Sequence, residues 1–426
     1  MRLTIQNGRL IDPSAGLDQQ ASLHLQDGRV LAIGEAPAGF VADQMVDATG
    51  LVVAPGLVDL AARLREPGFE YRATLESEMQ AALAGGVTSL SCPPDTDPPL
   101  DEPGLVEMLK HRARGLDGAR LFPLGALTVG LKGEIITEMA ELAEAGCIGF
   151  SAGAEVSVDT QTLLRAMQYA KTFGFTVWLQ PQDPQLARGG VAHGGPVAGR
   201  LGLPGVPVIA ETVALHTVFE LVRATGCRVH LCRLSSAAGI ELVRRAKAEG
   251  LPVSCDIAVH HLHLIDVDIG WFDSHYRVHP PFRTQRDRDA IRAAVADGTI
   301  DAICSDHTPV DDDAKLLPFS EAEPGVTGLE LLLPLTLKWA QEADVPLASA
   351  LARISTAAAG ILGIEAGSLR PGAVADVCLF DPSEYWVVEP GQLCSQGRHS
   401  PFLGREVVGR VRSTLVGGRV VFARAG

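Results

Sequence analysis

Three histidines near one another, His260, His261 and His263, first suggest a metal centre in this 426-residue chain. Neutral imidazole can hold zinc, and bound zinc can activate water and polarise a carbonyl group. The histidines end an apolar run typical of a buried strand. On a strand His261 and His263 would share one face, and His260 would point the other way. A metal cluster and packing in the core are both open at this point.

Other chemically capable residues follow two further apolar runs. His230 and Cys232 are two residues apart in RVHLCRLS, and Asp306 with His307 follows DAIC. His230 and Cys232 would share a strand face, although burial beneath a neighbouring helix also accounts for a histidine there. Asp306 would need a positive partner if it were buried, because an unpaired buried carboxylate is strongly destabilising.

The elements that must position these residues form a repeating pattern between about residues 55 and 360. Short apolar runs alternate with helical stretches such as ATLESEMQAALAGG and AGIELVRRAKAEG, which end at glycines suited to helix capping. Such β-then-α units predict a (β/α)₈ barrel with any active site at the C-terminal ends of its strands. The eight runs are LVDLAARL, VTSLSCPP, RLFPLGAL, CIGFSAG, TVWLQP, RVHLCRLS, PVSCDIAVHH and DAICSD.

The two ends of the chain are rich in short strands instead. We predict that residues 1–53 and 366–426 pair as a small β-sandwich domain beside a barrel domain of residues 54–365. The dipeptides Asn7-Gly8, Asp27-Gly28 and Gly417-Gly418 are signals for hairpin turns.

The composition excludes several classes of protein. A net charge of −15 argues against nucleic acid or an anionic membrane as partner, and no window approaches the ~18 apolar residues of a membrane span. The first residues do not resemble a signal peptide. The eight cysteines have no CxxC spacing and lie mostly in apolar runs, which predicts buried free thiols and a reduced, cytoplasmic protein.

The segment APGLVDLAARLREPG, residues 54–68, resembles the PGLVDLHVHLREPG segment of dihydroorotases in the amidohydrolase superfamily. The resemblance continues in order over nearly the whole chain and implies the same barrel and β-sandwich. Active members are similar to other metal hydrolases in using zinc-bound hydroxide. The further matching segments are PPDTDPPLD, LSSAAGIELVRRAKAEGLPVSCDIAVHHL, RVHPPFR, DAICSDHTP, PGVTGLELLLPL, GSLRPGAVADVCLFDP and SPFLGREVVGRV.

The resemblance also locates the family's zinc ligands, and nearly all of them are replaced. The His-x-His of the first strand falls at Ala61 and Arg63, and the bridging aspartate of the fourth strand falls at Ala152 in GFSAGA. The histidines of strands five and six fall at Gln180 and Arg233.

Only the strand-eight aspartate is kept, as the vestigial Asp306. One carboxylate cannot hold a catalytic zinc, and the cations Arg63 and Arg233 would repel it. We therefore expect no zinc, no other cofactor and no catalytic residue. We also expect one or both guanidinium groups to occupy the former metal space and pair with Asp306.

The substrate positions implied by the resemblance are altered as well. The carboxylate-binding arginine is kept as Arg65, whereas Asp95, His279 and Val310 stand where the family has asparagine, asparagine and histidine. Asp95 would repel an anionic substrate, so no substrate-binding residue is assigned. The family carries the His260-His261 pair without using it for metal, which favours packing.

These replacements predict a catalytically inactive dihydroorotase-like protein. Similar metal-free proteins of some bacteria are non-catalytic subunits that assemble with aspartate transcarbamoylase, which implies its catalytic chain as partner and a homo-oligomer within a mixed complex. Two alternatives are an active metal-dependent cyclic amidohydrolase with a rearranged site and a sensor that binds a metabolite through Arg65.

Overall fold

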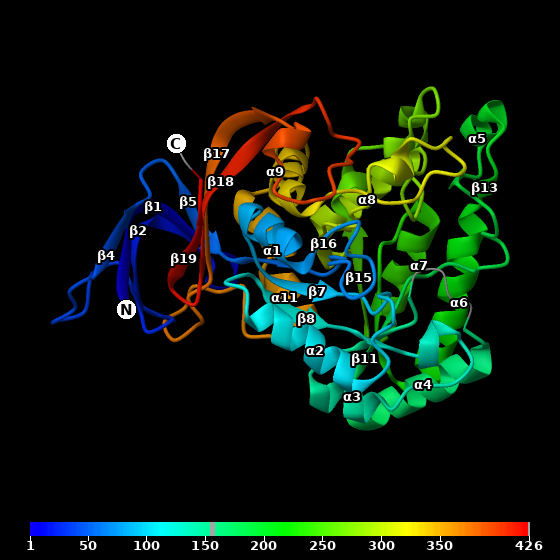
Figure 1. The fold of residues 1–426 in the computed structure, drawn as a ribbon, viewed down its shortest axis with the longest axis horizontal. Coiled ribbons are helices and arrows are strands. Elements are labelled where there is room, and N and C mark those ends of the chain that lie inside the picture. The colour runs from blue at the N-terminus through cyan, green and yellow to red at the C-terminus, as the bar shows by residue number, and fades with distance from the viewer. Residues whose placement is uncertain (154–157, 425–426) are drawn as a thin grey trace.

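The computed structural model describes residues 1–153 and 158–424. Figure 1 shows a barrel surrounded by helices, with a sheet built from both ends of the chain beside it. The predicted fold class is confirmed: apolar runs form parallel barrel strands, and the terminal segments pair with each other.

All eight predicted apolar runs contain barrel strands, and the third run is divided in two. The barrel strands form two sheets, β6-β7-β8 and β9-β10-β11-β14-β15-β16. Neighbouring strands within each sheet are parallel. An Ala62–His307 bridge closes the ring between its first and last strands. The strands are β6 (Leu57–Asp59), β7 (Val87–Cys92), β8 (Arg120–Pro123), β9 (Gly125–Ala126), β10 (Phe150–Ser151), β11 (Thr176–Leu179), β14 (Arg228–Leu231), β15 (Val253–Ala258) and β16 (Ala302–Cys304).

Amphipathic helices follow the strands and cover the outside of the barrel (Figure 1). The helix α4, for example, is capped at its start by Asp159 and ends at Gly174, whose φ of 74° suits glycine. The helices are α1 (Leu75–Ala84), α2 (Pro103–Arg114), α3 (Met139–Ala145), α4 (Thr160–Phe173), α5 (Pro196–Leu201), α6 (Val208–Thr225), α7 (Ala237–Ala248), α8 (Gln285–Asp297), α9 (Leu332–Glu342), α10 (Leu347–Arg353) and α11 (Thr356–Leu362). A short parallel pair, β12 (Ala192–His193) and β13 (Gly205–Val206), flanks α5.

The terminal strands form one eight-stranded sheet in the order β19-β18-β17-β5-β1-β2-β3, with β4 paired to β1. Ile5, Leu23 and Leu379 belong to an apolar core of its own, whereas Val52 and Phe380 of the same sheet belong to the main core shared with the barrel domain. The strands are β1 (Arg2–Asp12), β2 (Leu17–Gln26), β3 (Arg29–Ile33), β4 (Gln44–Asp47), β5 (Val52–Pro55), β17 (Val377–Val387), β18 (Glu406–Val416) and β19 (Arg419–Ala423).

Two local predictions are corrected. Asn7-Gly8 is a bulge inside the single strand β1 and not a hairpin turn, because the β1–β2 register shifts between Ile5 and Gly8 and a side chain at Gly8 would clash with Val53. The histidine pair is not on a strand either: β15 ends at Ala258, and residues Val259–Leu262 form a 3₁₀ turn. The Asp27-Gly28 and Gly417-Gly418 turns do join neighbouring strands.

The environment of the thiols agrees with the composition. Six of the eight cysteines are buried as free thiols, and only Cys394 is exposed. In the described part of the chain, no helix combines the length and apolar character needed to cross a membrane.

We expect the Asp376 carboxylate to contribute strongly to the joint between barrel and terminal sheet. It is buried, accepts from both Arg120 nitrogens at 2.9 and 3.1 Å, and accepts from the Gly417 N–H at 2.7 Å. Asp376→Ala should lower the free energy of unfolding by about 2 kcal/mol, since it leaves these donors without their acceptor. Urea denaturation measures the change.

The matched control is Asp117→Ala. It breaks the Asp117–Arg419 pair, which spans the same joint at 3.1 Å with side chains 80% and 65% exposed. That change should stay below about 0.5 kcal/mol because water screens exposed pairs. Equal effects of the two variants would contradict the assignment.

Candidate functional site

The six family ligand positions all lie at the C-terminal end of a barrel strand. Each residue follows its strand by one to four positions, so the closed barrel directs them toward one mouth. They are Ala61 and Arg63 after β6, Ala152 after β10, Gln180 after β11, Arg233 after β14 and Asp306 after β16.

A buried ion pair occupies the centre of this group. The Arg233 Nη1 atom donates to Asp306 Oδ1 at 2.8 Å, and its Nη2 atom donates to Gln180 Oε1 at 2.5 Å. Both charged side chains are nearly inaccessible, 6% and 5% exposed. Burial alone would lower the pKa of Arg233, but the Asp306 carboxylate together with other neighbouring groups outweighs burial and raises that pKa, so the guanidinium stays charged. The expected pairing is confirmed for Arg233.

The backbone of Arg233 is held in place from the neighbouring strand. Its φ of 53° is in the left-handed region, and its N–H donates to Asp256 Oδ1 at 2.6 Å. The other Asp256 oxygen contacts His230 Nε2 at 3.0 Å. Asp256 and His230 are thus positioning residues that direct Arg233 into the barrel. Sequence analysis missed Asp256, although a lone carboxylate in the apolar run SCDIAV signals a buried partner.

Arg63 supplies a second cation to the same centre. Its Nη1 atom lies 3.7 Å from Asp306 Oδ1 and donates to Thr308 Oγ1 at 2.9 Å. Its Nε atom donates to Asp95 Oδ2 at 2.8 Å. Although burial alone would raise the pKa of Asp95, Arg63 holds it below its usual range. Asp95 and Asp306 therefore form with the two arginines a group of two negative and two positive charges.

Neutral histidines pack beside this group. Burial and the Arg233 guanidinium lower the pKa values of His260 and His279 to about 3, and burial with His260 lowers that of His261 to about 3. The rings of His260 and His261 lie 4.8 Å apart and contact Phe282. His260 Nε2 is 3.9 Å from Asp306 Oδ2. His263 lies apart from them and contacts the Leu335 carbonyl at 2.9 Å.

The donors present do not fit a zinc ion. Zinc requires about four lone pairs at roughly 2.0–2.3 Å, and a cation cannot share that space. Here Asp306 Oδ1 and Gln180 Oε1 both accept from Arg233. Within residues 1–153 and 158–424, no group of three or more His, Cys, Asp or Glu side chains is arranged to hold a metal ion.

The former substrate positions border a cavity of about 360 Å³. Arg65, Asp95 and His279 line it, whereas Val310 is buried in the core and does not. Arg65 Nε donates to the Pro309 carbonyl at 2.8 Å. Burial and the neighbouring Arg63 lower the pKa of Arg65 to about 10, which still leaves it charged at neutral pH.

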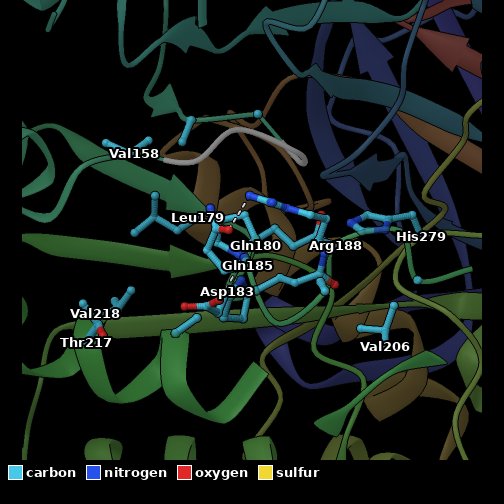
Figure 2. A pocket seen from close by; sticks show the side chains of 18 of the residues that line it. Val158, Leu179, Gln180, Asp183, Gln185, Arg188, Val206, Thr217, Val218 and His279 are labelled. Atoms are coloured by element: carbon cyan, nitrogen blue, oxygen red, sulfur yellow. Dashed lines mark hydrogen bonds between the residues drawn. The ribbon is translucent and has the colours of Figure 1, made fainter. Parts of the chain in front are cut away.

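A second cavity, of about 730 Å³, opens between the 180–191 segment and α6. Figure 2 shows Gln180 in this cavity with Asp183, Gln185 and Arg188, and His279 at one side. The Arg188 guanidinium donates to the Gln185 side-chain oxygen, so the partner in this contact is a neutral amide and not a carboxylate. The cavity shares Gln180 and His279 with the site.

Comparison with known proteins relates the whole chain to one family. A family model described as dihydro-orotase-like matches residues 50–238, and an amidohydrolase family model matches residues 152–422. A dihydroorotase-like protein of Pseudomonas aeruginosa is 47% identical over 426 residues, which cover 99% of each chain. A protein of Geobacter sp. named dihydroorotase is 39% identical over 422 residues, again 99% of each.

Solved structures share the architecture. An L-hydantoinase (dihydropyrimidinase) from Arthrobacter aurescens superposes with a TM-score of 0.89 at 24% identity, covering 100% of this chain and 96% of that one. A D-hydantoinase from Thermus sp. gives 0.84 at 21% identity, with 99% and 95% covered. At these identities the likeness supports the fold alone.

We expect Asp306→Ala to be among the most destabilising single changes at the site. It would leave Arg233 buried without a counter-charge, and removing one partner of a buried pair typically lowers the free energy of unfolding by about 3–5 kcal/mol. The double variant Arg233→Met, Asp306→Leu removes both charges and should recover much of that loss. Urea denaturation of the three proteins measures it, and an Asp306→Ala protein as stable as the parent would contradict the buried pair.

The three histidines of lowered pKa should make the protein sensitive to mild acid. Their pKa values of about 3 in the folded chain lie below the ordinary value of 6.5, so between these limits the unfolded chain binds more protons. The free energy of unfolding must then fall as pH drops from 6.5 toward 3. His279→Asn should make this slope shallower between pH 6.5 and 4.5. The control His111→Asn, on the exposed face of α2, should leave it unchanged, and identical slopes for both would contradict the assignment.

Proposed function

The chain belongs to the dihydroorotase-like family, and on that premise we propose that it is a catalytically inactive member. Its role is that of a cytoplasmic structural subunit that assembles with the catalytic chain of aspartate transcarbamoylase in pyrimidine biosynthesis.

The Arg233–Asp306 pair carries the proposal of inactivity. Opening a cyclic amide at neutral pH needs a strong nucleophile and a polarised carbonyl, which this family obtains from zinc. The one retained ligand is bound by a guanidinium at 2.8 Å, and a second guanidinium lies 3.7 Å away. A metal ion would have to displace one cation and approach another. The neutral His260 near Asp306 does not make up the missing ligands.

The intact framework supports a role for the folded surface. The barrel is closed, the strand ends are ordered by specific hydrogen bonds, and the terminal sheet has its own core. Two relatives named dihydroorotase-like protein are 47% identical to the chain, and several named dihydroorotase are 36–40% identical, which supports a branch separate from the enzymes. The sequence resemblance implies that this surface binds an enzyme of the same pathway.

The 360 Å³ cavity favours a second candidate, a sensor of an anionic metabolite. Arg63, Arg65 and Arg72 line it together with the neutral His279. Its carboxylates Asp95, Asp306 and Glu323 each contact an arginine, which leaves Arg65 as the guanidinium without a carboxylate contact among the described lining residues. A pyrimidine intermediate that binds the folded chain there would raise its melting temperature.

Co-expression with the aspartate transcarbamoylase chain of the same organism tests the proposal. We expect one mixed complex by sedimentation, with carbamoyl transfer that depends on this chain. The purified chain should not turn over dihydroorotate, with or without added zinc. Each protein expressed alone is the control.

Two results would overturn this function. The first is a transcarbamoylase that reaches full size and activity without this chain. The second is zinc-dependent dihydroorotate turnover that Asp306→Asn abolishes, which would favour the rearranged amidohydrolase.

A further inference from the structure

Two loops at the barrel mouth expose large apolar side chains. Residues 266–277 follow β15 and its 3₁₀ turn, and residues 311–323 follow β16. Trp271 is 94% exposed and Leu316 is 80% exposed. We call this set of side chains the mouth patch: Val267, Trp271, Phe272, Leu316 and Leu317.

A buried lysine joins the two loops. Lys315 is 4% exposed, and its Nζ atom donates to the carbonyls of Arg277 at 3.0 Å and Glu323 at 2.7 Å. Its own carbonyl accepts from the Ser274 hydroxyl. Trp271 and Leu316 thus lie within three residues of the same contact, on loops that these hydrogen bonds join. Binding through such a surface avoids much of the entropy loss of ordering a loop.

Trp271 differs from the other tryptophans in its solvent exposure. Trp178, Trp339 and Trp386 are all buried. An indole in water exposes a large apolar area without compensation, whereas tryptophan and phenylalanine are enriched at the centres of protein interfaces. The free chain therefore displays the kind of residues that most often carry binding energy.

The fully exposed charges of the two loops have one sign, and Arg277 at the end of the first loop is half-buried. Every ionisable side chain that the two loops expose is acidic: Asp273, Asp312, Asp313 and Glu321. The one lysine is buried, and His275 is half-buried against Asp273 at 2.9 Å. Two copies meeting through this patch would bring acid against acid, which disfavours self-association. A partner with an apolar hollow ringed by lysine and arginine would match it.

The position of the patch fits a barrel that does not turn over substrate. Residues of the same loops line the cavities, Glu323 the smaller one and Arg277 and Ser320 the larger one. A protein seated on the patch would cover this mouth. A bound protein would block substrate entry in an active enzyme of this fold, but it would not impair a structural subunit.

We propose that the mouth patch is the docking surface for a different protein, one whose contact face has an apolar centre and a basic rim. The assignment rests on the proposed function, which supplies the transcarbamoylase catalytic chain as that protein.

The test measures binding of that chain to Trp271→Ala and Leu316→Ser variants of the full-length protein. Each should weaken the affinity at least about 30-fold, as expected for central anchors. The matched controls are Tyr385→Ala and Met45→Ser, which remove side chains 64% and 61% exposed on the terminal sheet. They should bind like the parent. Unchanged melting temperatures would show that all variants are folded.

A second variant tests the charged rim without touching the apolar centre. Asp312→Lys with Asp313→Lys should slow association several-fold and reduce its dependence on salt, because steering acts mainly on the rate of encounter.

The remaining outcomes are distinct. If the parent binds and the Trp271 and Leu316 variants bind equally well, the patch proposal is wrong while the mixed complex stands. If the parent does not bind at all, the proposed function is wrong. The patch proposal is then overturned as well, because it names the transcarbamoylase chain as the partner. Concentration-dependent self-association that Trp271→Ala abolishes would identify a second copy as the occupant and overturn the proposal.

Discussion

The buried contact between Arg233 and Asp306 constrains everything else at the barrel mouth. A carboxylate 5% exposed needs a positive partner, and Arg233, which follows β14, supplies it at 2.8 Å from beyond the intervening strand β15. That solution then needs the left-handed backbone at Arg233, the Asp256 carboxylate that fixes its N–H, and His230 behind it. The adjoining histidines are neutral because burial, and after it the charge of the Arg233 guanidinium, disfavours their protonated form.

The predictable features follow from patterns carried by many residues together. Eight apolar runs with helices between them imply the barrel, and the charges at positions 63, 233 and 306 imply their pairing. Features set by a few backbone contacts did not follow. Asn7-Gly8 has turn chemistry, yet the fit of Gly8 against Val53 makes it a bulge, and β15 ends at Ala258 before the histidines. From the sequence, Asp95 is expected to repel an anionic substrate. Its contact with Arg63 cannot be foreseen because the two residues are 32 positions apart.

The mouth of the barrel and the proposed role are physically compatible. Inside the pocket each carboxylate contacts an arginine, and Arg65 donates to the Pro309 carbonyl, so these polar groups have partners within the protein. Outside it, the apolar side chains of the mouth patch remain in water, and sequence reading missed them because a tryptophan between aspartates in IDVDIGWFDSH has no periodic pattern. The chain thus combines an interior of paired carboxylates with an acidic, apolar-centred rim, and this combination supports the proposal that the mouth patch binds a protein.

Crystals of the protein soaked in zinc, with diffraction recorded on both sides of the zinc absorption edge, test the central claim most directly. The account predicts no anomalous peak among positions 61, 63, 152, 180, 233 and 306, with the Arg233 guanidinium in contact with Asp306. A strong peak bound by Asp306, with Arg233 turned away from it, would contradict the account.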